Sequence, residues 1–230
     1  MKQEIRLFGA IAVRPAVLAL LSRFETATGF TVAVKRELNP TVKKQIEAGE
    51  PFDVVITNPN LVDDLTASGK VEAGSQIAFG RIAMGVAANA GSRPPGIESV
   101  EAFKQALKSA KSIAYASEGT SGGYFSGLLE RLGIAEEVKS KLVAVTGGQT
   151  APAVGRREAE LGVVPVTSIP AASPKVMLVG KFPPELQSYV DFAIGISANS
   201  TDAGAAKQLS EFLVSAAVDD ILAAKGIDRV

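Results

Sequence analysis

Strand-like and helix-like segments alternate along the first 70 residues of this 230-residue chain. Residues 5–8, 30–34 and 54–57 form short apolar runs, and amphipathic stretches of helical period separate them. The run at 54–57, Val-Val-Ile-Thr, shows no polar alternation, which is typical of a strand in a parallel sheet buried on both faces. This order of segments predicts one half of a doubly wound α/β fold.

The rest of the chain repeats the pattern and adds two longer apolar segments, at 76–88 and 189–196. We expect each of them to cross between two lobes. The predicted fold class is α/β, with two doubly wound lobes joined by a two-strand hinge and a ligand cleft between them. The expected lobe 1 is 1–82 plus 193–230 and the expected lobe 2 is 83–192, with hinge crossings near 82 and 192.

Composition excludes several kinds of chemistry. The chain has no His and no Cys, so Ser-His-Asp triads, thiol nucleophiles and His or Cys metal sites are excluded. Its 24 basic and 24 acidic residues cancel, which argues against a nucleic-acid partner. We predict no cofactor and no metal held by protein ligands, and any proton transfer would use Asp, Glu, Lys or Tyr.

The first residues bear on location. Residues 1–8 lead directly into a strand-like segment, without the features of a signal peptide, and no apolar run has the length of a membrane span. We therefore expect a periplasmic protein if a leader has been removed and a cytoplasmic one otherwise. The expected assembly state is a monomer.

A Gly-rich turn within 116–129, ASEGTSGGYFSGLL, joins a strand-like run to a helix expected to start near Gly123. Such a turn leaves free N–H groups at a helix N-terminus, where anions bind. We therefore predict ligand contacts from Thr120, Ser121, Gly122 and Gly123. The alternative is an ordinary strand–helix loop with Ser121 as the N-cap.

A second polar turn, at 146–150, follows the strand expected at 141–145. Gly147, Gly148 and Gln149 are the predicted contacts there. The alternative is a connection that needs a positive φ at one glycine.

Three loops of the first half supply further candidates. The loop after the first strand contributes Ala10, Ile11 and Arg14, whose alternative role is that of a solvated arginine at a helix start. The remaining predicted ligand contacts are Asn39, Thr41 and Asn58. Asn39 and Asn58 each precede a proline, so the alternative for both is an N-cap before Pro at the first helical position.

Four segments carry a resemblance to a known family: LFGAIAVRPAV, QIEAGEPFDVVIT, GTSGGYFSGLLERLGI and REAELGVVPV. Together they resemble the molybdate-binding-protein-like branch of the type 2 periplasmic-binding-protein fold, over nearly the whole chain. QIEAGEPFDVVIT is the most specific of them. The resemblance implies a two-lobed clamp that holds an oxyanion with hydroxyls and backbone amides.

The sequence departs from that branch at three hydroxyl positions. The family's Ser in the first loop falls on Ala12, its Ser in the second loop on Asn39, and its late Tyr on Pro165. Without these donors a buried tetrahedral oxyanion is poorly satisfied, which argues against molybdate and tungstate. Arg14 instead suits a planar carboxylate.

Two functions remain open at this point. The first is a substrate-binding protein for a small organic anion, with an ABC transporter permease as partner if the chain is exported. The second is a cis/trans or double-bond isomerase of a small unsaturated carboxylate such as aconitate. GTSGGYFSGLL, REAELG and Pro184–Gln187 resemble a sub-branch similar to aconitate isomerase. Its catalytic groups are not identified by the sequence, and Glu118 and Tyr124 are weak candidates.

Overall fold

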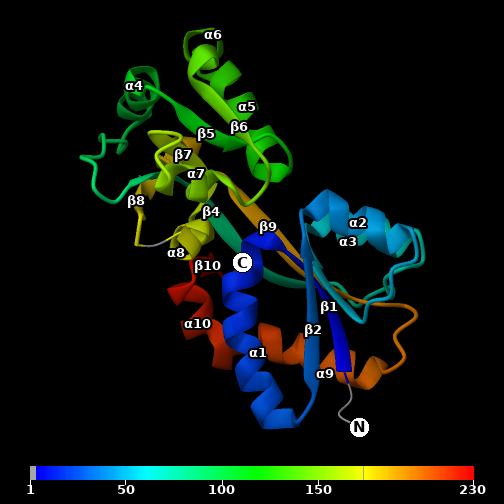
Figure 1. The fold of residues 1–230 in the computed structure, drawn as a ribbon. Coiled ribbons are helices and arrows are strands. Elements are labelled where there is room, and N and C mark those ends of the chain that lie inside the picture. Colours follow the sequence, from blue (N-terminus) through cyan, green and yellow to red (C-terminus); the bar gives the residue numbers. More distant parts are fainter. Residues whose placement is uncertain (1–3, 173) are drawn as a thin grey trace. The chain divides into compact units, whose positions relative to one another are not determined.

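The computed structural model describes residues 4–172 and 174–230, which form two compact units. Unit 1 comprises the chain up to Arg81 and from Asp191 on, and unit 2 comprises Ile82–Val190. Strands β4 (Ile77–Asn89) and β9 (Tyr189–Ile196) run from one unit into the other. Helices and strands alternate in both units, so the predicted α/β class is confirmed (Figure 1).

Unit 1 is built on four strands in the order β2-β1-β3-β9. Strand β1 (Glu4–Ala10) is parallel to β2 (Thr31–Glu37) and to β3 (Val54–Thr57). Strand β3 is fully buried, as its apolar run predicts, but its other neighbour, β9, is antiparallel to it. Strand β3 is thus parallel to β1, as its apolar run indicates, while β9 returns to this sheet in the opposite direction.

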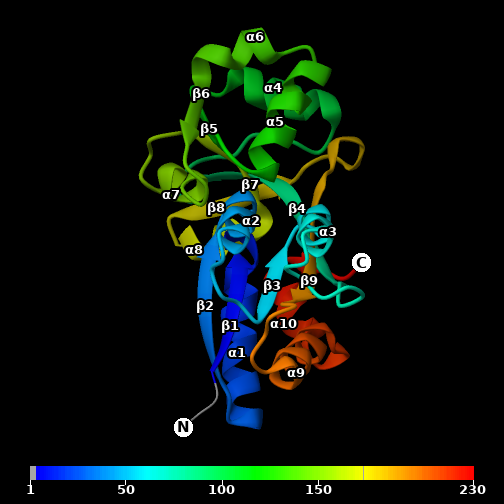
Figure 2. The ribbon, with the colours of Figure 1, turned by 90° about the vertical axis from the view of Figure 1, so that its right-hand side faces the viewer.

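Helices cover both faces of this sheet (Figure 2). Helices α1 (Arg14–Thr28) and α9 (Ala203–Val214) lie on one face, where Phe24 and Phe212 meet with ring centroids 5.4 Å apart. Helices α2 (Asn39–Glu47) and α3 (Pro59–Ala67) lie on the other, over a core of Phe8, Val42, Ile46, Phe52, Val55, Val62, Leu65, Val71 and Ala193. Helix α10 (Asp219–Ala224) and the short β10 (Ile227–Asp228), which pairs with β4, complete the unit.

Unit 2 is built on a second mixed sheet. Strand β5 (Ile113–Ala116) is parallel to β6 (Leu142–Val145) and to β7 (Leu161–Pro165). The β4 residues of this unit are antiparallel to β7 on one side and to β8 (Val176–Lys181) on the other.

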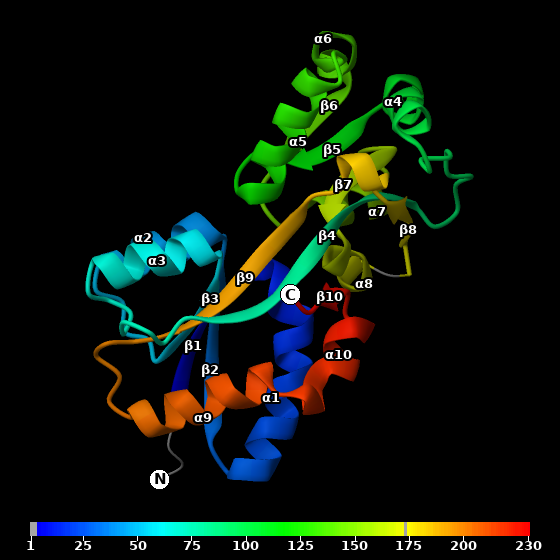
Figure 3. The ribbon, with the colours of Figure 1, turned by 180° about the vertical axis from the view of Figure 1, so that it is seen from behind.

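The helices of unit 2 also lie on both faces of its sheet (Figure 3). Helix α5 (Thr120–Arg131) packs on β5 through Phe125 and Tyr115, and α4 (Val100–Ser109) and α6 (Ala135–Val138) extend this layer. Helices α7 (Thr150–Gly155) and α8 (Ile169–Ala172) cover the other face, over a core centred on Ala114 and Val164.

In each unit the parallel strands end at one edge of the sheet. In unit 1 these ends are Ala10, Glu37 and Thr57, and in unit 2 they are Ala116, Val145 and Pro165. We call these the strand-end edges. No helix in the described part of the chain is long and apolar enough to cross a membrane.

Candidate functional site

The first loop of unit 1 passes from β1 into α1 through a single 3-10 turn at Ile11–Val13. Ala10 is the last residue of β1 and is buried, and Ile11 follows it half-buried. Arg14 is the first residue of α1, with Pro15 directly behind it, so a rigid start holds Arg14 at the strand-end edge. The Arg14 side chain is exposed and has no ion-pair partner among the described residues.

Asn39 and Thr57 connect two of the strand ends. The Thr57 hydroxyl, which is fully buried, donates to Asn39 Oδ1 over 2.9 Å. Asn39 is the first residue of α2, and the N-cap is Leu38, so the interpretation of Asn39 as the N-cap was wrong. The bond fixes the amide and leaves its Nδ2 donor for another partner.

Thr41 and Asn58 complete the unit 1 candidates. Thr41 lies half-buried in the first turn of α2. Asn58 is the N-cap residue of α3 by position, as the alternative predicted, but its side chain makes no capping bond. Asn58 Nδ2 instead donates to the carbonyl of Asp191 over 2.8 Å, which ties the end of β3 to β9.

Helix α5 begins at Thr120, after an N-cap Gly119 with φ of 86°. The predictions of a start near Gly123 and of Ser121 as the N-cap were wrong, because glycine at 119 permits the turn three residues earlier. Gly122, in the first turn of α5, is buried against the end of β5: a Cβ there would lie 1.9 Å from the carbonyl oxygen of Ala116. Glycine thus lets the helix start press against the strand. Thr120 and Gly123 are exposed and Ser121 is half-buried.

The second polar turn lies beside the first. Ser117 follows β5, and both its N–H and its hydroxyl donate to the carbonyl of Val145 at the end of β6. Gly148 has φ of 80°, so the turn does need a positive φ at one glycine, and Gly147 precedes it half-buried. Gln149 is the exposed N-cap residue of α7. The structure therefore brings the two predicted turns together at the strand-end edge of unit 2.

The helix N-termini at these edges share an electrostatic feature. Helices α4 and α9 carry side-chain caps, from Ser99 and Asp202. Helices α1, α2, α3 and α5, which start at the strand-end edges, have neither a side-chain cap nor an acidic residue in the first turn. Their orphan N–H groups and positive dipole ends therefore keep their capacity to bind an anion.

The two side chains considered for proton transfer differ in their surroundings. Glu118 is exposed in the turn between β5 and α5. The Tyr124 hydroxyl donates to the carbonyl of Leu186 over 2.8 Å and accepts from Arg131 Nη2 over 3.1 Å. Packing of Tyr124 within unit 2 thus occupies its donor.

Asp53 is a buried charged residue that was not among the predicted functional groups. Asp53, 3% exposed, is bound by the Arg6 guanidinium and lies just before β3. Asp53 lies within QIEAGEPFDVVIT, the most specific of the resembling segments, and this position could have indicated its importance. It lies at the amino end of β3, away from the strand-end edge, and therefore serves stability rather than binding there. The described residues contain no group of three acidic side chains placed to hold a metal ion.

Comparison with known proteins agrees with this architecture. The family model described as bacterial extracellular solute-binding protein matches residues 5–228. Aconitate isomerase from Pseudomonas sp is 29% identical over 198 residues, which cover 84% of this chain and 75% of that protein.

Solved structures show the same fold. The periplasmic molybdate-binding protein of Azotobacter vinelandii is 20% identical with a TM-score of 0.81, covering 97% of this chain and 98% of its own. The substrate-binding domain of a molybdenum ABC transporter from Clostridium difficile, described as putative, is 20% identical with a TM-score of 0.79 over the whole of both chains. L-phospholactate-bound PEB3 of Campylobacter jejuni is 12% identical with a TM-score of 0.75, covering 98% and 100%. The resemblance to the molybdate-binding-like branch is confirmed.

Proposed function

The chain belongs to the bacterial extracellular solute-binding protein family, and from that membership we propose that it binds a small organic carboxylate for transport. In this proposal the ligand contacts come from the helix starts at the strand-end edges. The observation that carries it is the start of α5, where a helix N-terminus without a cap or an acidic residue follows β5. A helix start of this kind selects an anion and repels a cation.

The preference for a carboxylate over a tetrahedral oxyanion is supported by the donors present. Asn39 offers an amide nitrogen after its bond with Thr57, and Arg14 offers a guanidinium. A guanidinium matches the two oxygens of a carboxylate in one plane. The sequence resembles the molybdate-binding branch, but this chain has Ala12 and Pro165 at two positions where that branch has a hydroxyl.

The partner and the location are proposed from the family and from one structural neighbour. The family is described as extracellular, and the Clostridium difficile neighbour is described as the substrate-binding domain of an ABC transporter. We propose an ABC permease as the partner of this chain and the periplasm as its location.

The first test is calorimetric titration with molybdate, sulfate, succinate, citrate and the two aconitates. A ligand that binds only the folded chain also raises its melting temperature. We expect a carboxylate to bind and molybdate not to bind. Tight molybdate binding would contradict the argument from Ala12, Asn39 and Pro165.

A negative charge placed at the start of α5 tests ligand binding without destabilising the fold. Ser121→Asp puts a carboxylate in the first turn, where it favours the helix but repels an anionic ligand. We expect unchanged melting of the free chain and a loss of affinity of about tenfold or more. Ser126→Asp, on an exposed position of the same helix, is the matched control and should bind normally.

Arg14 is tested in the same manner. Arg14→Gln should weaken carboxylate binding by about tenfold or more, because a charge-assisted contact is lost. Arg23→Gln changes another exposed arginine of α1, far from the helix start, and should leave affinity unchanged. Equal effects of the two substitutions would show that only the overall charge matters.

The aconitate isomerase relative favours a second candidate function, isomerisation of a small unsaturated carboxylate. Glu118 is the exposed carboxylate in the turn before α5, and we propose it as the base in that case. Incubation with cis-aconitate in D2O, followed by proton NMR, would detect conversion to the trans isomer and deuterium uptake. Conversion that disappears in Glu118→Gln, with binding retained, supports the isomerase. Binding of aconitate without conversion would contradict the isomerase function and support the transport function.

A further inference from the structure

Thr57 is the polar residue at the end of the otherwise apolar strand β3, and its side chain is fully buried. Because side chains alternate along a strand, Thr57 shares a face with Val55, which packs in the core beneath α2 and α3. Pairing with β9, where Thr57 lies opposite Ala193, fixes the backbone at this point. The Thr57 hydroxyl is therefore held on the face of the sheet that α2 covers, where that helix begins.

A hydroxyl at this buried position calls for a physical reason. Valine has nearly the same shape and would continue the apolar run of β3 without burying a polar group. A buried hydroxyl costs free energy unless it forms a hydrogen bond, and Thr57 forms one by donating to Asn39 Oδ1 over 2.9 Å. The effect of Thr57 on Asn39 therefore distinguishes it from a valine.

This bond decides which way the Asn39 amide faces. The Thr57 hydroxyl has a single hydrogen and makes no other hydrogen bond within the described part of the chain. With the amide reversed, Asn39 Nδ2 would donate to Thr57, and the buried hydroxyl hydrogen would lose its acceptor at the full desolvation cost. The bond thus holds Oδ1 inward and leaves Nδ2 as the group that a ligand can meet.

The start of α2 around Asn39 offers donors and no negative charge. The carbonyl of Leu38 already accepts from the N–H groups of Thr41 and Val42, each over 2.9 Å, and Pro40 has no N–H. The first turn of α2 holds no acidic residue. Asn39 Nδ2 and the Thr41 hydroxyl have no hydrogen-bond partner among the residues that the structure describes. A ligand oxygen at this helix start therefore meets unused donors and the positive end of the helix dipole.

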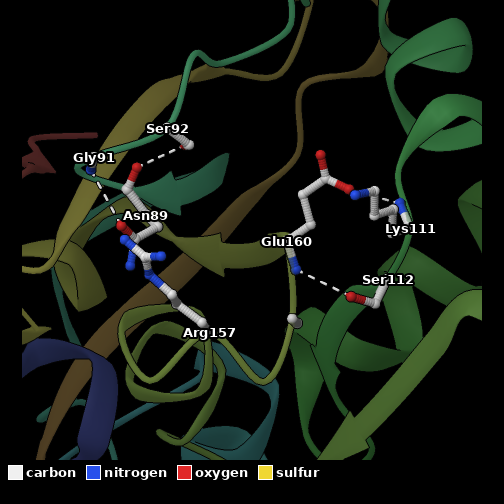
Figure 4. Close-up of a pocket in the computed structure, with 8 residues that line it drawn as sticks. Asn89, Gly91, Ser92, Lys111, Ser112, Arg157 and Glu160 are labelled. Atoms are coloured by element: carbon white, nitrogen blue, oxygen red, sulfur yellow. Dashed lines mark hydrogen bonds between the residues drawn. The ribbon is translucent and has the colours of Figure 1, made fainter.

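A pocket of about 390 Å³ in unit 2 has a different character (Figure 4). Its Glu160 carboxylate accepts from the N–H of Lys111 over 2.6 Å, and Asn89 Oδ1 accepts from the N–H of Gly91 over 3.1 Å. Figure 4 shows Arg157 beside Asn89 and Gly91, whereas the Glu160 carboxylate extends toward Lys111. These polar groups hold the loops of unit 2 and do not converge on one point, as the donors at the start of α2 do.

We propose that Thr57 is a positioning residue that makes Asn39 a fixed hydrogen-bond donor and thereby selects a ligand oxygen that only accepts, as in an ionised carboxylate. A free amide can present either Oδ1 or Nδ2, and it would then also accept from an ammonium group. With the amide fixed by Thr57, an ammonium group would meet a donor and the positive end of α2. The inference rests on the proposed function, because it names what sets the selectivity of the same strand-end edge.

The test uses the full chain and whichever of succinate, citrate and trans-aconitate it binds most tightly in calorimetric titration. Thr57→Val removes the hydroxyl, and affinity should fall by about fivefold because the amide is no longer held. Thr57→Ser keeps the hydroxyl and should keep affinity within about twofold. Thr66→Val is the matched control. It removes a bond of the same length, from Thr66 to the carbonyl of Val62 in α3, and should leave affinity unchanged.

A double-mutant cycle separates positioning from general damage to the fold. Asn39→Ala removes the amide and should weaken binding by about tenfold or more. Thr57→Val added to Asn39→Ala should then change affinity by less than about twofold, since no amide is left to position. Asn39→Asp keeps the shape and the bond from Thr57 but presents an oxygen to the ligand, so it should bind at least as weakly as Asn39→Ala.

The outcomes distinguish this inference from the function on which it rests. If the natural chain binds none of the three carboxylates, the proposed function fails and the role of Thr57 fails with it. If the natural chain binds, unchanged affinity in Thr57→Val, or the same loss with and without Asn39, would overturn the role of Thr57 alone. Normal binding by Asn39→Asp would likewise show that position 39 is not a donor to the ligand.

Discussion

Arg6 and Asp53 form a two-pronged ion pair between β1 and the residue that leads into β3. Arg6 Nε lies 2.9 Å from Asp53 Oδ2, and Arg6 Nη2 lies 2.9 Å from Oδ1. The N–H of Arg6 also donates to Oδ2, and the Ser200 hydroxyl donates to Oδ1. This carboxylate therefore joins β1, β3 and the loop after β9 within unit 1.

Asp53→Asn should destabilise the chain by about 1–3 kcal/mol, because it breaks a half-buried charge pair and leaves Arg6 without its counter-ion. Urea unfolding at neutral pH measures this loss. Glu50→Gln is the matched control. It breaks the exposed Lys35–Glu50 pair, whose nitrogen–oxygen distance is 2.8 Å, and should cost less than about 1 kcal/mol. Equal losses would contradict the special role of Asp53.

The same carboxylate predicts a pH dependence. Burial alone raises the pKa of Asp53, but hydrogen bonds from the Arg6 side chain and backbone and from Ser200 outweigh it and hold the pKa below its ordinary 3.8. The stabilisation is thus complete above that ordinary value and is lost as pH falls through the lower folded-state value. Unfolding free energy measured between neutral and acidic pH should fall less in Asp53→Asn than in the natural chain. Parallel curves would contradict this.

Gly122 and Gly127 give a matched pair on α5. A Cβ at Gly122 would lie 1.9 Å from the carbonyl oxygen of Ala116, whereas one at Gly127 meets nothing within 4 Å. Gly122→Ala should push the helix start from β5 and destabilise the chain by about 1–3 kcal/mol. Gly127→Ala should stabilise it by about 0.5–1 kcal/mol through helix propensity. Thermal unfolding distinguishes the two signs.

Tyr124→Phe tests whether that hydroxyl serves packing or the ligand. The substitution leaves the carbonyl of Leu186 without its donor and should cost about 1 kcal/mol in unfolding free energy. Affinity for the carboxylate should stay within about twofold, because the donor faces Leu186. A large loss of affinity, or of any isomerase activity, with little change in stability would show that Tyr124 belongs to the functional site.

Arg157 is the one non-glycine residue of the described chain with a left-handed backbone, with φ of 65°, and Arg157→Gly tests the strain there. Glycine adopts the left-handed φ at little cost, so the variant should be more stable by about 1 kcal/mol. Arg156 has φ of −82°, and Arg156→Gly should bring no such gain. Chemical denaturation without ligand compares the two, and a less stable Arg157→Gly would contradict the strain argument.

Local signals predicted most of the elements and failed at particular helix starts. The apolar run at 54–57 and the proline at 15 marked β3 and the start of α1 correctly. The start of α5 was misplaced because Ser121 fits an N-cap by type, while glycine at 119 fits the turn by backbone geometry. Asn39 was wrongly interpreted as an N-cap. Its side chain instead accepts a hydrogen bond from Thr57, which lies 18 residues further along the chain.

The sequence alone determined the α/β class, the polar turns after β5 and β6, and the absence of His and Cys chemistry, because these depend on local periodicity and on composition. Tertiary structure decided the antiparallel return of β9 beside β3, the burial of Asp53 against Arg6 and the pocket behind Arg157. Each of these brings together groups distant along the chain or depends on a backbone angle that residue type does not specify. Such pairings are set by the global packing of the units, for which a local pattern carries no signal.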